Sequence, residues 1–316
     1  GGEAAVDARY LQRVVATLGD GLIALSLSQS GESLRITAGS AAFRLRTVDA
    51  GDFPLQAVPA GGHVRIETAA LIDLISRTTF CAAEDEEVSP FAWVLVVCGR
   101  GEIAMTATDS YQLAHYRLPA KDEGSGRAAP VSEAVVPTSG LSALTRALAR
   151  LGDEETILLW HDRSLWCRSG PVAWRMRLLD LTYPNVSRYT GPLAGNRIEV
   201  GREALLEALR QVASIADERG AVGLRVEGTR LHVYASHREI GEAQAVVVLA
   251  EERPPCEVWI DAERLARAAK AQPEAVIALY ISEPLAPVAL APASGRVAYR
   301  TVLTPLRYYV PEAEVV

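Results

Sequence analysis

The sequence predicts an α+β fold made of repeated β-α-β-β-β units. Short amphipathic helices recur at nearly even intervals, and runs in which apolar and polar residues alternate follow them. In the later units such a run also precedes the helix. The predicted helices cover residues 7–18, 69–77, 139–151, 202–216 and 261–271, so their starts lie 62, 70, 63 and 59 residues apart. Unrelated elements would not be spaced so evenly, and the chain therefore repeats about five times.

Each predicted helix has one apolar face at helical spacing. In the first, Leu11, Val14 and Leu18 share a face, and in the fourth Leu205 and Leu209 do so. Charged residues occupy the other side, and every one of these helices carries arginine. These patterns are typical of helices that cover one face of a sheet.

Strands with period-2 alternation are predicted around the helices. In the first, third and fourth units they follow the helix, at 22–27, 34–38 and 43–46, at 156–160, 165–168 and 172–178, and at 222–226, 231–235 and 243–249. Strands at 134–137, 197–201 and 257–260 precede a helix. One helix cannot cover both faces of such a sheet, so two units are expected to share a core.

The units divide the chain into three predicted domains. Residues 1–66 hold one unit and form a partial first domain whose front half is expected to be absent. Residues 67–192 and 193–316 hold two units each. A loop rich in Gly, Ser and charge, 119–130, falls inside the second domain, and residues 191–195 mark the boundary before the third.

Composition places the chain among ordinary globular proteins. It has 316 residues, 49% hydrophobic and 22% charged residues, and a formal charge of −7, which excludes disordered, collagen-like and fibrous classes. No run approaches the ~20 apolar residues of a membrane-spanning helix, and no targeting signal is evident at the start. The expected location is the cytoplasm. Four widely separated cysteines indicate neither a disulfide framework nor a zinc site.

Nothing in the sequence favours an enzyme. Asp109 and Ser110 near His115, or His161 beside Asp162, are residue types of a hydrolytic site. No GxSxG, glycine-rich phosphate loop, HExxH or carboxylate cluster accompanies them. We therefore expect no catalytic residues, no metal and no cofactor.

Five separated segments resemble one family. Residues 107–114, ATDSYQLA, resemble the ATD-x-x-x-LA signature of the bacterial DNA polymerase III beta subunit, the ring-shaped sliding clamp. Residues 182–185 with Arg188 resemble its G-x-FPD linker, and 304–307 its terminal MPMR. The other segments similar to the family are 71–77 followed by Thr79, Phe80, Glu84, Asp85, Glu86 and Phe91, and 203–209 with 241–243.

The resemblance implies an architecture and a function. Helices would line a central hole and sheets would form the outside of a ring closed by a head-to-tail homodimer. The protein would be a processivity factor that encircles double-stranded DNA without sequence preference, associated with the nucleoid. Its implied partners are the polymerase III catalytic subunit, the clamp loader and other clamp-binding replication and repair proteins.

The resemblance also implies a hydrophobic groove between the second and third domains that binds short peptides of these partners. Apolar walls would supply affinity and polar groups orientation. Carried over by position, its lining would be Phe91, Thr108, Ser110, Tyr111, Gln112, Leu113, Pro184, Arg188, Tyr189, Val302, Thr304, Pro305, Leu306 and Arg307. Simple strand core is the alternative reading for Leu113 and Val302.

Basic residues on the predicted helices are the candidates for facing DNA, since phosphate contacts carry no base readout. They are Arg9, Arg13, Arg77, Arg146, Arg150, Arg202, Arg210, Arg264, Arg267 and Lys270. The alternative for each is a solvated charge on a helix face.

Three departures from the family pattern keep a second function open. Tyr111 and Gln112 replace the usual His-Arg pair, Thr304 and Leu306 replace methionines, and the chain continues from Tyr308 to Val316 past the usual end. A specialised paralogue with altered peptide preference would fit this. The alternative function is a clamp-like scaffold or inhibitor that binds clamp-interacting peptides without encircling DNA.

Overall fold

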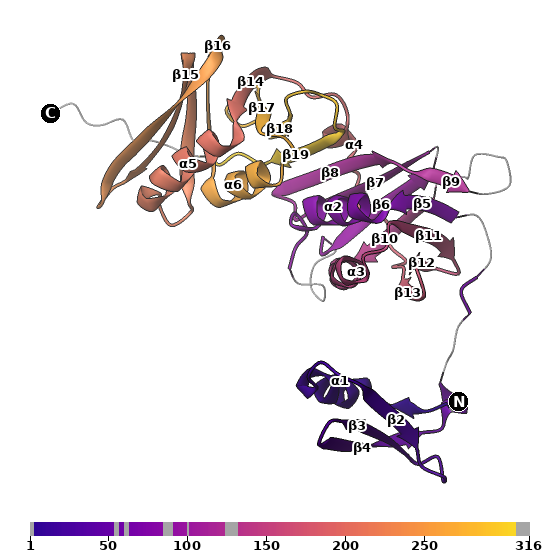
Figure 1. Ribbon diagram of the computed structural model, residues 1–316. Coiled ribbons are helices and arrows are strands. Elements are labelled where there is room, and N and C mark those ends of the chain that lie inside the picture. The colour runs from indigo at the N-terminus through magenta and orange to yellow at the C-terminus, as the bar shows by residue number, and fades with distance from the viewer. Residues whose placement is uncertain are drawn as a thin grey trace. The chain divides into compact units, whose positions relative to one another are not determined.

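The computed structural model describes residues 3–53, 57–59, 63–84, 91–99, 101–123 and 132–307. The chain forms two compact units, residues 1–58 and 59–316. Figure 1 shows the elements of each. The segment from Tyr308 onward, predicted as a C-terminal extension, lies outside the described residues, as does most of the 119–130 loop.

The first unit has one helix and one sheet. Strand β1 (Ala5–Val6) precedes α1 (Ala8–Thr17), and β2 (Ile23–Leu27), β3 (Ser33–Ala38), β4 (Ala41–Val48) and a 3-10 turn, η1 (Ala50–Asp52), follow. The sheet order is β1-β4-β3-β2. The Asp7 side chain caps α1 by accepting hydrogen bonds from the amides of Arg9 and Tyr10. No residue of α1 is buried.

An eight-stranded antiparallel sheet runs through the second unit. Its order is β10 (Ser132–Pro137), β6 (Trp93–Gly99), β7 (Glu102–Thr108), β8 (Gln112–Pro119), β19 (Tyr299–Leu303), β18 (Val288–Pro292), β17 (Val276–Ile281) and β14 (Asn196–Gly201). Strands from residues 93–137 therefore form one half of the sheet, and strands from 196–303 form the other.

Two further sheets complete this unit. One has the order β13 (Val172–Arg177), β12 (Ser164–Ser169), β11 (Glu155–His161), β5 (His63–Glu67) and β9 (Lys121–Glu123). The other pairs the long strands β15 (Ala221–His237) and β16 (Gly241–Asp261).

Helices pack in pairs over these sheets. Helix α2 (Thr68–Thr79) contacts α3 (Thr138–Leu151), and α5 (Arg202–Val212) contacts α6 (Ala262–Lys270) (Figure 1). Two short turns, α4 (Ser187–Thr190) and the 3-10 segment η2 (Ala213–Ile215), lie between longer elements. One core gathers Leu71, Leu74 and Leu144 with their neighbours, and a second gathers Leu205 and Leu265 with theirs. Each core thus lies beneath a pair of helices.

The predicted repeat is confirmed. Five β-α-β-β-β units follow one another, and all five helices lie where the apolar spacing placed them, within a few residues at each end. Two long strands follow α5. Strand β15 contains the predicted strands 222–226 and 231–235, and β16, which runs from the fourth unit into the fifth, contains 243–249 and 257–260. The prediction of separate strands was wrong there. A register shift around Gly228 bends the β15–β16 ladder without ending it.

Strands β5 and β9 were not predicted, and no bounds were predicted for β6, β7 and β8 of the second unit or for β17, β18 and β19 after the last helix. Strands β5 and β9 pair with each other through Arg65 and Lys121, and β9 occupies the start of the segment predicted as a loop. Both strands are short, so alternation gave little signal. Strand β5 starts at His63, and its residues Val64 and Ile66 pack into the same core as α2. The domain bounds 1–66, 67–192 and 193–316 stay a prediction.

Candidate functional site

The candidate site lies where the two halves of the eight-stranded sheet meet. Strands β8 and β19 pair antiparallel, with Leu113 opposite Val302 and Tyr116 opposite Tyr299. The two tyrosine rings meet edge to face, with their centroids 5.2 Å apart. The Tyr299 hydroxyl donates to the Arg77 carbonyl over 3.0 Å, which ties the seam to α2.

A small apolar cluster forms over this seam. Leu113, Val302 and Ala289 are buried, but each keeps a small exposed area, 4%, 8% and 7% of its surface. The cluster therefore lies just beneath the surface. Partly buried side chains packed against it come from the segment that includes α4 and from β17; they are Val186, Tyr189, Leu193 and Tyr280. The cluster thus joins residues that are nearly 200 positions apart in sequence.

Sequence reasoning found Leu113, Tyr189 and Val302 but missed the other members of the cluster. Ala289 and Tyr280 lie on the strands β18 and β17, whose apolar runs predict strands without showing which residue faces the seam. Phe91 was predicted to line the groove, yet among the described residues the cluster does not include it. Its carbonyl accepts a hydrogen bond from the Ala83 amide over 3.0 Å.

A tight turn between β7 and β8 presents the polar part of the site. The Asp109 carboxylate accepts hydrogen bonds from the amides of Tyr111 and Gln112, both over 2.8 Å. Thr108 Oγ1 donates to the Gln112 carbonyl over 2.6 Å. Ser110 adopts a positive φ of 77°, a conformation that a non-glycine residue seldom takes. These contacts hold the Tyr111 ring out in solvent, with 56% of its surface exposed.

The segment after β19 crosses this turn. The Thr304 amide donates to the Tyr111 carbonyl, and the Leu306 amide to the Trp259 carbonyl, both over 2.8 Å. Pro305 and Leu306 are half-buried between these anchors. The predicted groove residues differ in burial. The exposed ones are Ser110, Tyr111, Arg188, Thr304 and Arg307. Phe91, Pro184, Tyr189, Pro305 and Leu306 are half-buried, and Thr108, Gln112, Leu113 and Val302 are buried.

The basic helix residues fall into two groups. One group is exposed: Arg9 and Arg13 on α1, Arg146 and Arg150 on α3, Arg210 on α5, and Arg267 and Lys270 on α6. Arg146 and Arg150 form no ion pair within the described part of the chain. Arg210 pairs with Glu207 over 2.7 Å, and Arg267 lies 3.9 Å from Glu263.

The second group makes contacts within the protein, and two of its members connect helices. Arg77 pairs with Asp73 at 2.7 Å and donates to the Ala271 carbonyl beyond the end of α6. Arg202 Nη1 donates to the Gln272 carbonyl over 3.0 Å. Arg264 pairs with Asp261 and lies over the Tyr111 ring. These three side chains already have partners, which the helical pattern could not reveal.

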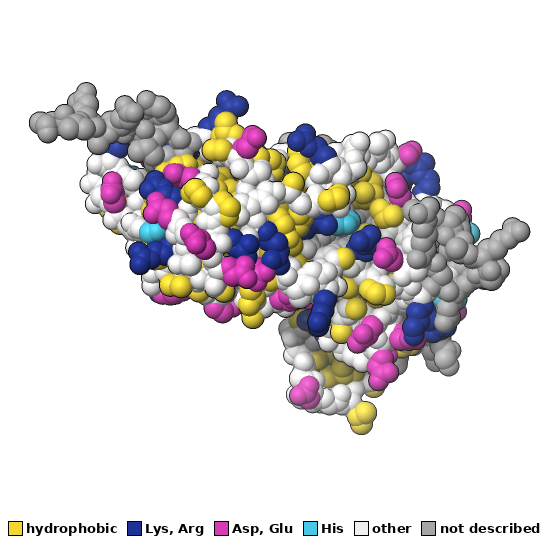
Figure 2. Space-filling view, turned by 90° about the horizontal axis from the view of Figure 1, so that it is seen from above, with side chains coloured by type: hydrophobic (Ala, Val, Ile, Leu, Met, Phe, Trp, Pro, Cys, Tyr) yellow, Lys and Arg dark blue, Asp and Glu magenta, His cyan; other side chains and the backbone are white. Residues whose placement is uncertain are grey.

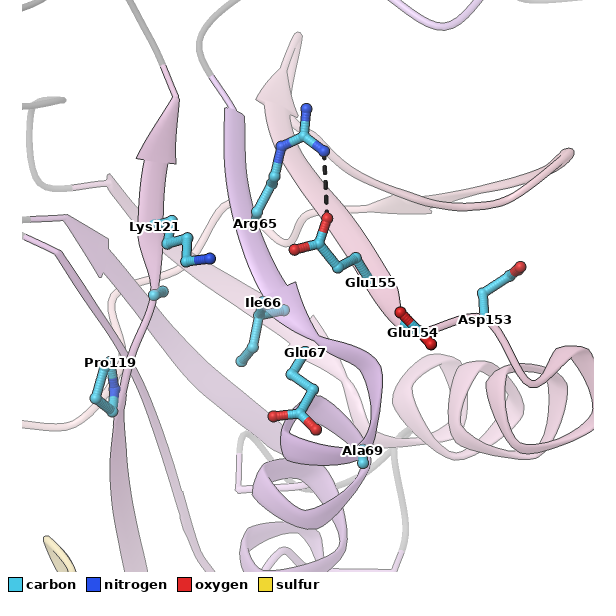
Figure 3. A pocket seen from close by; sticks show the side chains of 10 residues that line it. Arg65, Ile66, Glu67, Ala69, Pro119, Lys121, Asp153, Glu154 and Glu155 are labelled. Carbon is cyan, nitrogen blue, oxygen red and sulfur yellow. Dashed lines mark hydrogen bonds and ion pairs between the residues drawn. The ribbon is translucent and has the colours of Figure 1, made fainter.

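Surface charge forms no continuous band in the view of Figure 2, where basic and acidic side chains alternate. A cavity of about 740 Å³ beside β5, β9 and the start of β11 is lined by Arg65, Glu67, Lys121 and residues 153–155 (Figure 3). Arg65 Nη1 lies 3.4 Å from Glu155 there. The lining includes none of the predicted site residues. Across the described ranges, no group of three His, Cys, Asp or Glu side chains could hold a metal ion, and no helix could cross a membrane.

A half-buried histidine, His115, lies on β8 two residues from Leu113. Burial, together with the smaller effect of the nearby charges of Arg300 and Arg117, lowers the pKa of His115 from 6.5 to about 4. His115 Nδ1 shares a hydrogen bond with Thr106 Oγ1 over 2.9 Å. The ring is therefore neutral at pH 7, and strand β8 carries an uncharged imidazole between two arginines.

Comparison with known proteins places this site in a family context. Residues 65–185 match the family described as DNA polymerase III beta subunit, central domain. A beta sliding clamp of Synechococcus elongatus is 26% identical over 275 residues, which cover 85% of this chain and 72% of that protein.

Solved structures show the same fold. The DNA polymerase III beta subunit of Thermotoga maritima is 20% identical, with a TM-score of 0.85, over 97% of this chain and 82% of that chain. A Pseudomonas aeruginosa sliding clamp bound to griselimycin is 22% identical, with a TM-score of 0.85 over the same shares. These likenesses confirm the predicted clamp fold.

The neutral His115 predicts a pH dependence of stability. The unfolded chain takes up a proton near pH 6.5 and the folded chain only near pH 4, so stability falls as the pH drops between these values. Between pH ~7.5 and ~5 the wild type should lose about 2 kcal/mol more than His115→Gln, since each pH unit in that window is worth about 1.4 kcal/mol. Urea unfolding followed by tryptophan fluorescence measures this, because all five tryptophans lie in residues 59–316. Equal losses in the two proteins would contradict the assignment.

Proposed function

We propose that this chain, which is related over most of its length to bacterial beta sliding clamps, encircles duplex DNA and holds replication proteins at the β8–β19 seam. It is a sliding clamp by fold and by relationship. The apolar cluster of Leu113, Val302 and Ala289 beside the exposed Tyr111 supports the peptide-binding part of this proposal. Such a site takes apolar side chains of a partner against its wall, while polar groups at the rim orient the peptide.

The proposed partners are the DNA polymerase III catalytic subunit, the clamp loader and other clamp-binding replication and repair proteins. We assign Pro305 and Leu306, half-buried directly after β19, to the wall of the groove, and the exposed Arg188, beside Tyr189, and Arg307 to its rim. The chain acts as an accessory subunit without catalysis of its own, in the cytoplasm at the nucleoid. These assignments rest on the relatives and on the site together.

We further propose a homodimer formed by strand addition. Strand β2 forms one edge of the four-stranded sheet and, within the described residues, pairs only with β3. An unpaired strand edge is a template for a strand of a second copy. Leu22 and Leu25, exposed at 97% and 65%, add the apolar surface that marks an interface.

Contact with DNA is assigned to the exposed basic residues of the helices. Arg146 and Arg150 lie one turn apart on α3 and have no carboxylate partner in the described parts of the chain, so their charge is available to phosphates. Arg77 and Arg202 are less suited, because their guanidinium groups already bind backbone carbonyls. Phosphate contacts without base readout suit a protein that moves along DNA.

Removing the wall of the groove tests the peptide site. Pro305→Gly with Leu306→Ala should weaken binding of a peptide from the tail of the polymerase catalytic subunit at least about tenfold, because a hot spot of apolar contact is lost. Fluorescence anisotropy measures the affinity. Leu285→Ala, which shortens an exposed leucine elsewhere, should leave it unchanged. Equal affinity of the double variant and the wild type would refute the assignment.

Removing two helix charges tests the DNA face. Arg146→Ala with Arg150→Ala should reduce clamp-dependent DNA synthesis and make its salt dependence shallower, since about two phosphate contacts are lost. The matched control is Arg168→Ala with Arg177→Ala, two exposed arginines on β12 and β13. Synthesis that is normal at low and at high salt in the α3 variant would show that these arginines point elsewhere.

A further inference from the structure

A polar cavity lies on the sheet of the first unit. It has a volume of about 460 Å³ and is lined by Arg35 of β3, Arg44 of β4 and three serines, Ser26, Ser28 and Ser33. The remaining lining residues are apolar, so the described residues around the cavity include no acidic side chain. The cavity therefore combines positive charge and hydrogen-bond donors without a negative charge to balance them.

The strand register sets the two arginines side by side. Arg35 lies opposite Arg44 in the β3–β4 ladder and opposite Ser26 in the β2–β3 ladder, so the three residues form one row across the sheet. Because successive residues of a strand point to opposite faces, this row lies on the face away from the buried Ile36. Arg46, two residues after Arg44 on β4, shares that face. Three arginines thus gather on one side of a small sheet.

These three charges have no carboxylate partner within the described part of the chain. Like charges directly opposite one another destabilise a pair of strands, and no ion pair offsets that repulsion between β3 and β4. The acidic residues nearest in sequence, Glu32 and Asp49, accept hydrogen bonds from Ser30 Oγ and the Gly51 amide. An anion bound between the arginines would remove the repulsion and stabilise the folded sheet.

Arg44 is oriented by contacts at the base of its guanidinium group. Its Nε donates to Ser33 Oγ over 2.9 Å, and the Ser33 amide donates to Ser28 Oγ over 3.1 Å. Ser33 is buried, with 8% of its surface exposed, so its hydroxyl is a fixed acceptor. The terminal nitrogens of Arg44, Nη1 and Nη2, donate to no described residue. They remain available to a ligand.

This set of groups suits a phosphoryl group. Guanidinium groups bind phosphate oxygens through paired, charge-assisted hydrogen bonds, and two of them supply two positive charges. A terminal phosphate carries nearly two negative charges at pH ~7 and has several acceptor oxygens. The exposed Ser26 hydroxyl, at the end of the row, adds a neutral donor. A carboxylate, with two oxygens and one charge, would match fewer of these groups.

We propose that the row of Ser26, Arg35 and Arg44 is a binding site for the phosphoryl group of a small ligand, either inorganic phosphate or a nucleotide. Arg35 and Arg44 bind its oxygens from two sides, and Ser26 donates a further hydrogen bond. The site lies on the first unit and rests neither on the proposed peptide groove nor on the proposed DNA contacts of the helices.

Titration of the full chain with inorganic phosphate at constant ionic strength tests this proposal. In nitrogen-15 nuclear magnetic resonance, the amide signals of Ser26 and Ser33 should shift together along one saturation curve. The amide of Arg168 on β12 should stay in place. Thymidine monophosphate distinguishes the two sources, because tighter binding than that of phosphate indicates a nucleotide and equal binding indicates phosphate alone. Thymidine, which lacks the phosphoryl group, should cause no shift at these amides.

Variants show which side chains form the site. Arg35→Gln with Arg44→Gln should weaken phosphate binding at least about tenfold, because both charged donors are lost. The matched control, Arg168→Gln with Arg177→Gln, removes two exposed arginines of β12 and β13 and should bind phosphate like the wild type. Ser26→Ala keeps every charge and should weaken binding about threefold, which a general attraction of anions would not produce.

Three results would overturn the proposal. One is a set of shifts that grows linearly with phosphate and never saturates, and another is equal phosphate affinity in the wild type and the Arg35→Gln, Arg44→Gln variant. The third is binding of thymidine as tight as that of its monophosphate. None of these results would bear on the peptide groove, since the ligand and the signals followed belong to the first unit.

Discussion

The antiparallel pairing of β8 with β19 is the interaction on which the candidate site depends. It joins two groups of four strands into one sheet and sets Leu113 opposite Val302. A slip of one residue would turn both side chains to the other face, so the register creates the apolar cluster. The edge-to-face tyrosines and the contact of Arg77 with Ala271 fix that register from the helix side. Folding and binding thus rely on the same seam.

Much of the fold could be predicted because the chain repeats. Apolar residues at helical spacing placed all five helices, and the even intervals identified the unit without any tertiary information. Alternation also located the strands of the fourth unit and the strand before the fifth helix, but it could not show that residues 221–237 form one continuous strand. A bend at Gly228 and a true strand end look alike in sequence, since both interrupt the alternation.

The site was predicted in part. Leu113, Val302 and Tyr111 were chosen through the resemblance to clamps; the structure places Leu113 and Val302 in one cluster, and Tyr111 lies exposed on the adjoining turn. Ala289 was not predicted as part of the site because, in an apolar strand, nothing in the sequence distinguishes one alanine from its neighbours. The roles of Arg77, Arg202 and Arg264 were equally hidden. Helical spacing puts an arginine on a face, but its partners are a carbonyl or a ring from distant segments. Only tertiary contacts separate an anchoring arginine from a solvated one.

The most direct test of this account is whether a bound peptide changes the environment of the side chains at the β8–β19 seam. Carbon-13 methyl labelling of leucine and valine, followed by titration with the peptide Leu-Ala-Leu-Phe, reports each side chain by nuclear magnetic resonance. The account predicts that the methyl signals of Leu113 and Val302 shift together along one saturation curve. The signal of Leu25, in residues 1–58, should stay in place. Saturable shifts that leave Leu113 and Val302 unmoved would contradict it.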